Sequence, residues 1–138
     1  LFVDSETHDA PKHDALFTCP PYWDLEMYAG DGLHRNPTWD SFLRSYRRVL
    51  TRCVAAASPA ARYCIVVGDW RRAGVYYDLT FQTERILVDL GLTPHDRVIL
   101  SSKRQTPIKA MIHQAKRLMY TVKVHQTMLV YDVPLEHQ

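Results

Sequence analysis

The residues most suited to a chemical role lie at positions 14–22, which read Asp-Ala-Leu-Phe-Thr-Cys-Pro-Pro-Tyr. Proline lacks the N–H group that a sheet ladder requires, so a strand that enters this stretch is expected to stop at Cys19. A residue that precedes proline is held out of the helical region, which makes the corner rigid. The two prolines offer only carbonyl acceptors, and Tyr22 adds a flat aromatic surface. This combination suits a planar group with an exocyclic amine, such as a nucleobase.

The corner and its context resemble the amino-methylating DNA methyltransferases, whose catalytic loop is Asp, Asn or Ser followed by Pro-Pro and an aromatic residue. Further stretches are similar to phage and bacterial methylases of that group, and they occur at residues 19–28, 42–46, 66–71 and 125–130. The resemblance implies a Rossmann-like class I fold, S-adenosylmethionine as the cofactor and DNA as the substrate. The biological setting stays open between restriction–modification, phage self-protection and an orphan regulator.

The resemblance also implies roles for single residues. Cys19 and the carbonyl of Pro20 would accept hydrogen bonds from the target amine, with Pro21 holding the corner. Tyr22 would stack on a base swung out of the duplex. This interpretation requires the Tyr22 ring to face a cavity beside residues 19–22. The cofactor would be contacted by Asp4, Thr18 and Cys19, although Asp4 could equally be an acid that caps a turn.

Cys19 departs from the residues that are usual at its position. Related enzymes that act on adenine carry Asp or Asn there, and those that act on cytosine N4 carry Ser. A thiol is close to Ser in size but is a weak acceptor, so cytosine N4 is slightly favoured over adenine N6. The weak acceptor also leaves a second hypothesis open, a catalytically degenerate module that binds nucleic acid or a partner subunit. RNA or protein glutamine as the methyl acceptor is a third.

The glycine-rich cofactor loop of the resembling enzymes is absent from the 138 residues. The closest glycine pair, Gly30 and Gly32, follows the Pro-Pro corner and lacks a strand-to-helix context. In enzymes with this order of segments the loop lies upstream of the corner, so here it would precede Leu1. We therefore expect a partial domain, residues 1–138, that works with the upstream half of the same protein or as a homodimer.

Basic residues are concentrated in the last third of the chain, because residues 97–131 contain no Asp or Glu. Charge of one sign attracts polyanions, and the predicted nucleic-acid contacts are Lys103, Arg104, Lys109, Lys116 and Arg117. A solvated face with its acids elsewhere in the fold is the alternative. Residues 38–57 also predict a helix with an arginine-rich outer face, which is either solvated or binds phosphate. Its arginines are Arg44, Arg47, Arg48 and Arg52.

Strands alternate with helices along the chain, which predicts an α/β fold with a mainly parallel sheet, helices on both faces and a possible antiparallel edge strand. We expect strands at residues 1–3, 15–18, 63–67, 97–101 and 126–133, and helices at residues 38–57, 76–90 and 107–119. Thr38 is the expected N-cap of the first helix, Ser58-Pro59 its end, and Gly91 the C′ residue of the second. Ligands of such sheets bind at the carboxyl ends of strands. Asp4, residues 19–22, Gly68 and Asp69 should gather there.

Composition limits the remaining choices. The sequence contains no run of about 18 apolar residues, the length that a membrane-spanning helix needs. No charged-then-apolar leader opens the chain. Three cysteines at spacings unlike a zinc site predict no metal, and Cys53 and Cys64 are expected to be buried thiols. A reducing, cytoplasmic location fits this cysteine usage best. His125 has no metal-ligand neighbour and is expected to be a hydrogen-bonding residue at a strand end.

Overall fold

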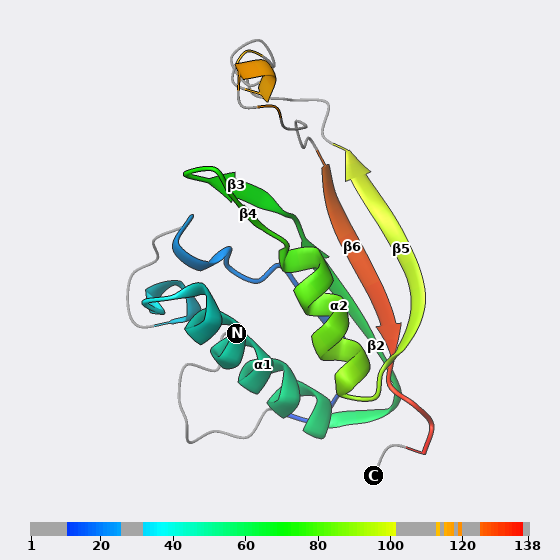
Figure 1. Ribbon diagram of the computed structural model, residues 1–138. Helices are drawn as coiled ribbons and strands as arrows, with labels where there is room; N and C mark the ends of the chain where they lie inside the picture. Colours follow the sequence, from blue (N-terminus) through cyan, green and yellow to red (C-terminus); the bar gives the residue numbers. More distant parts are fainter. Residues whose placement is uncertain are drawn as a thin grey trace.

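The computed structural model describes residues 11–25, 32–101, 113, 115–117, 119 and 125–136. The predicted strand at residues 1–3 and most of the predicted helix at 107–119 lie outside these residues, although 113 and 115–117 are helical. In chain order the elements are β1 (His13–Thr18), η1 (Trp23–Leu25), η2 (Leu33–Arg35), α1 (Trp39–Ala55), β2 (Ala57–Val67), β3 (Trp70–Arg72), β4 (Val75–Tyr77), α2 (Leu79–Asp89), β5 (Thr93–Ser101) and β6 (His125–Asp132). Figure 1 shows their arrangement.

The main sheet has four strands in the order β1-β2-β6-β5. β1 pairs with β2 in parallel, whereas β6 is antiparallel to both β2 and β5. β1, β2 and β5 therefore share one direction, and the reversed strand lies between two of them. The sheet is mixed, and the prediction that an antiparallel strand would stand at its edge is wrong. Because of this order, the start of β6 lies beside the ends of β2 and β5.

Helix α1 begins where its sequence predicts. Thr38 is its N-cap and forms a capping box with Ser41, in which each side chain accepts from the other residue's backbone N–H. The helix ends at Ala55, earlier than the expected stop at Ser58-Pro59. Pro59 instead lies in the first part of β2. This part is irregular, since the register against β1 shifts between the pairs His13–Ala57 and Ala15–Arg62.

Helix α2 begins three residues later than predicted, because Tyr76 and Tyr77 belong to a hairpin. β3 and β4 pair antiparallel around Ala73 and Gly74, whose φ angles of 49° and 81° are typical of a type I′ turn. The end of α2 confirms the prediction, since Gly91 has φ of 86° and follows the C-cap directly.

The core forms between the sheet and the two helices. α1 contributes Phe42, Tyr46, Leu50 and Val54, and alternate residues of β2 from Ala61 to Val67 meet them. Figure 1 shows α1 and α2 side by side on the same face of the sheet. α1 and α2 do not themselves meet the expectation of helices on both faces, which stays a prediction for the rest of the fold. Cys53 and Cys64 are half-buried rather than buried. No described helix has the length and apolar character to span a bilayer.

Candidate functional site

The Cys-Pro-Pro-Tyr corner lies directly after β1, at the carboxyl end of that strand. Cys19 is exposed, both prolines are buried and Tyr22 is half-buried. The corner has no regular structure, as proline chemistry predicts. The two buried prolines anchor the corner in the protein, while Cys19 stays accessible to solvent. We call residues 19–22 together with the neighbouring ends of β2 and β6 the rim.

Tyr22 joins three strand ends at the rim. Its hydroxyl accepts a hydrogen bond from Gln126 Nε2 at 2.7 Å, across 104 positions of sequence. A Cβ added at Gly68, just after β2, would lie 3.5 Å from the same hydroxyl. Residues 19–22 and Gly68 thus meet as predicted, whereas Asp4 lies outside the described residues. Gln126 was not predicted, and the available signal was its place beside His125 at the start of a strand.

The Tyr22 ring packs against a neighbouring aromatic ring, whereas the sequence led us to expect it to face a cavity. Its edge contacts Trp70, with ring centroids 5.5 Å apart and planes at 75°. Two surface hollows, of about 420 and 540 Å³, lie between α2 and β5 and on the outer face of α1, and neither is lined by residues 19–22. The cavity expected beside this corner is therefore neither of these two, and the phenol hydroxyl already has a partner.

Four aromatic rings form a wall behind the corner, and they are Trp23, Trp39, Trp70 and Tyr77. Trp70 stacks on Tyr77, with centroids 5.4 Å apart, and meets Trp39 edge-on at 5.6 Å. The buried Trp70 Nε1 has no hydrogen-bond partner in the described structure. A buried donor without a partner is unfavourable, and such groups in native proteins point to a functional or solvent contact.

Trp23 follows the corner with φ of 49°, a left-handed conformation that is uncommon for residues other than glycine. Its indole Nε1 donates to the carbonyl oxygen of Asn36 at 2.8 Å. The backbone N–H of Leu25 donates to the carbonyl of Tyr22 at 3.0 Å, which closes a tight turn. Strained residues persist where the surroundings hold them, and they concentrate at functional sites.

Asp69, predicted at the pocket edge, is turned toward α2. Its carboxylate accepts from the backbone N–H of Thr80 at 2.9 Å and from the Tyr76 hydroxyl at 2.6 Å. A carboxylate at a helix N-terminus satisfies unpaired N–H groups and the helix dipole. These contacts fix the exit of β2 against the start of α2, which gives Asp69 a structural task at the rim.

The other predicted site residues are distributed unevenly. Thr18 is half-buried at the end of β1, opposite Ile65 of β2. His125 is exposed at the start of β6. Of the predicted nucleic-acid contacts, Lys116 and Arg117 are exposed, while Lys103, Arg104 and Lys109 lie outside the described residues. Burial raises the pKa of the Tyr46 and Tyr63 hydroxyls and of the Cys53 thiol. All three groups therefore stay protonated near neutral pH.

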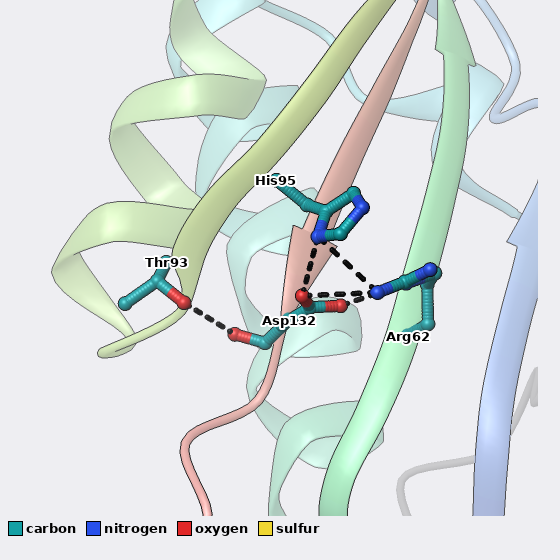
Figure 2. Close-up of polar contacts among 4 residues, drawn as sticks. All are labelled: Arg62, Thr93, His95 and Asp132. Atoms are coloured by element: carbon teal, nitrogen blue, oxygen red, sulfur yellow. Dashed lines mark hydrogen bonds and ion pairs between the residues drawn. The ribbon is translucent and has the colours of Figure 1, made fainter.

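A second polar cluster lies at the opposite end of the sheet, on the face turned away from the helices (Figure 2). Arg62 Nε donates to Asp132 Oδ1 at 2.8 Å, and His95 Nδ1 lies 2.8 Å from Asp132 Oδ2. The Arg62 hydrogen bond holds the pKa of the Asp132 carboxyl below its usual value. Thr93 Oγ1 donates to the Asp132 carbonyl at 3.4 Å. This cluster joins β2, β5 and β6.

Solved structures of DNA methyltransferases share this fold. TTHA0409 from Thermus thermophilus, a candidate DNA modification methylase, matches with a TM-score of 0.63 and 22% identity over 91% of this chain and 48% of that chain. Its complex with S-adenosyl-L-methionine matches at 0.63 and 23%, over 91% and 50%. The cytosine-N4-specific PvuII DNA methyltransferase matches at 0.64 and 13%, over 92% and 44%.

These likenesses show an α/β fold with the mixed sheet of the methyltransferase structures. The chain spans about half the length of the solved structures that it matches. No protein-family model and no curated protein sequence matches the chain.

Proposed function

We propose that this chain is the catalytic-loop part of an S-adenosylmethionine-dependent DNA amino-methyltransferase of Rossmann-like class I fold, with cytosine N4 favoured over adenine N6. The observation that carries the proposal is the position of residues 19–22. They follow a parallel strand at the rim of a sheet whose fold matches DNA methyltransferase structures. The small Cys19 side chain, close to Ser in size, supports the preference for cytosine.

In this proposal the corner acts by positioning. An exocyclic amine is a poor nucleophile because its lone pair is delocalised into the ring. Acceptors at Cys19 and the Pro20 carbonyl would bind the amine hydrogens and favour the form in which the lone pair is available. Tyr22 would hold the flipped base by stacking, which contributes roughly 1–3 kcal/mol. Orientation and electrostatics together supply most of the catalysis expected here.

In this proposal, residues at the end of β1 would form one side of the cofactor site. When bound, S-adenosylmethionine supplies an electrophilic methyl group. Thr18 and Cys19, at the end of β1, are the described residues that would contact it, and Asp4 stays a proposal outside them. Because the sequence has no glycine-rich loop, the other contacts would come from the upstream half of the same protein or from a second copy.

Methyl transfer tests the proposal directly. We expect the protein, with its upstream segment, to transfer tritiated methyl groups from S-adenosylmethionine to duplex DNA. Tyr22→Ala and Pro21→Ala should each reduce transfer at least 100-fold, on the order of what misplaced reacting groups lose. Pro94→Ala, at an exposed proline of β5, is the matched control and should keep full activity. Mass spectrometry of the digested DNA would distinguish N4-methylcytosine from N6-methyladenine. Full activity of both corner variants would refute the site.

A non-catalytic nucleic-acid-binding module is the second candidate. It is favoured by the engaged Tyr22 hydroxyl and by the contact of its ring with Trp70. In that case the protein binds DNA with strong salt dependence but does not bind S-adenosylmethionine. Isothermal titration with S-adenosylmethionine separates the two candidates, since only the enzyme should release or absorb heat of binding.

A further inference from the structure

The outward face of α1 carries a row of arginines that the proposed chemistry does not use. Arg44, Arg47, Arg48 and Arg52 are all exposed. Three of them border a hollow of about 540 Å³, together with the side chains of Ser41 and Ser45. Guanidinium groups beside hydroxyls are the usual partners of phosphate oxygens. The hollow is therefore chemically suited to an anion with several oxygen acceptors.

Hydrogen bonds connect this row to the corner. Arg48 Nη2 donates to Ser45 Oγ at 3.2 Å, and Ser45 Oγ donates to Asn36 Oδ1 at 3.1 Å. The carbonyl of Asn36 in turn accepts from the indole of Trp23, the residue after Tyr22. A fixed path thus runs from Tyr22's neighbour to a positioned guanidinium.

The spacing favours a polymer over a single ion. Arg44, Arg48 and Arg52 recur every four residues, so their Cα atoms rise by about 6 Å at each step. Arg47 lies on the same face and pairs with Asp89 at 2.8 Å. The exposed Asp40 precedes Arg44 by a turn, so among the described residues four arginines of the row stand against two acids, Asp40 and Asp89, and the row keeps a positive excess. DNA presents one phosphate per 3.4 Å of axis on each strand, which a row of this length can follow.

The helix also starts in the right place. The chain leaves β1 at the corner, passes through α1 and returns to the parallel strand β2. Because α1 therefore runs back from the rim, Arg44, in its first turns, is nearest the corner, and Arg48 lies near its middle. We propose that this row binds the phosphate backbone of duplex DNA whose target base reaches residues 19–22. The proposal rests on the function proposed above and assigns its DNA contact to α1.

Salt-dependent binding tests the proposal. Fluorescence anisotropy of a labelled DNA duplex would be measured between 50 and 200 mM salt, conditions over which phosphate contacts lose affinity steeply. We expect Arg44→Ala with Arg48→Ala to weaken binding roughly tenfold or more at the lowest salt, and to reduce the slope of log affinity against log salt by about 2. The loss should be the same for unrelated DNA sequences, since phosphates carry no sequence information.

The matched control removes the same charge elsewhere. Lys12→Ala with Arg85→Ala changes two exposed cations off this face, and its slope should stay that of the wild type. Circular dichroism would show that both double variants fold. An unchanged slope in the α1 variant, absent DNA binding by the wild type, or a loss seen with an RNA duplex but not with DNA would each overturn the proposal. Intact methyl transfer with an unchanged slope refutes this inference alone, and a reduced slope without methyl transfer refutes the enzyme alone.

Discussion

The two ends of the sheet use polar groups in different ways. At the rim, Gln126 and Tyr22 share a neutral hydrogen bond against a wall of aromatic rings. At the opposite end, the exposed side chains of Arg62 and His95 contact the half-buried carboxylate of Asp132 in a charged cluster. Both groups of contacts join strands that are far apart in sequence. High salt should weaken the charged cluster by screening it, and acid should weaken it by protonating Asp132. Neither should change the neutral hydrogen bond at the rim.

This difference indicates that the charged cluster stabilises the sheet, whereas the rim is the candidate site. Both carboxylate oxygens of Asp132 accept hydrogen bonds from Arg62, which gives this carboxylate a structural role. Beside the rim, by contrast, Trp70 Nε1 and Asp24 Oδ1 are buried without partners in the described residues, and Trp23 has a left-handed conformation. Buried polar atoms without a partner near residues 19–22, together with the exposed Cys19, make the rim rather than the charged cluster the candidate functional site.

The largest effect on stability should come from the aromatic wall. Trp39→Ala removes ring contacts with Trp23, Phe42, Trp70 and Tyr77. We expect the free energy of unfolding in urea to fall by about 3 kcal/mol, within the range for large aromatic truncations. Phe81→Ala, at a side chain that is 53% exposed, is the control and should change it by less than about 1 kcal/mol. Equal losses in both variants would contradict the importance of the wall.

An intermediate effect is expected from Gln126, which positions Tyr22. Gln126→Ala should lower methyl transfer roughly tenfold by freeing the ring, while stability changes by less than about 1 kcal/mol because Gln126 is exposed. Gln126→Glu should restore activity, since its carboxylate can accept from the Tyr22 hydroxyl. Gln82→Ala, a glutamine on α2, is the matched control. If alanine and glutamate at position 126 behave alike, Gln126 does not position the ring.

The smallest effect should come from the charged cluster. The Arg62 hydrogen bond lowers the pKa of Asp132 in the folded protein, so its stabilisation is present above the unfolded pKa of about 3.9 and is lost as pH falls through the folded value. Asp132→Asn should therefore lower the melting temperature slightly at pH 7, with the difference shrinking below about pH 4. One molar salt should also shrink it. A difference that grows in acid would contradict this assignment.

Sequence reasoning succeeded where the determinants are local. The sequence predicted helix α1 with its arginines on the outer face, and Thr38 predicted its start. It failed in two places for different reasons. The start of α2 was placed too early because Tyr76 and Tyr77 form a short hairpin with β3, and Gln126 was not predicted because its partner is 104 positions away. Most of the predicted basic contacts and Asp4 lie outside the described residues, so they stay predictions.

The sequence by itself determined the rigid corner at residues 19–22, the amphipathic α1 and the turn at Gly91, because proline geometry, helical periodicity and glycine's tolerance of positive φ act within a few residues. Only the tertiary structure decided that β6 runs antiparallel between β2 and β5, that Gln126 reaches Tyr22, and that α1 and α2 cover one face. Strand order and direction depend on which apolar faces can be buried together, and that is a property of the whole packed chain.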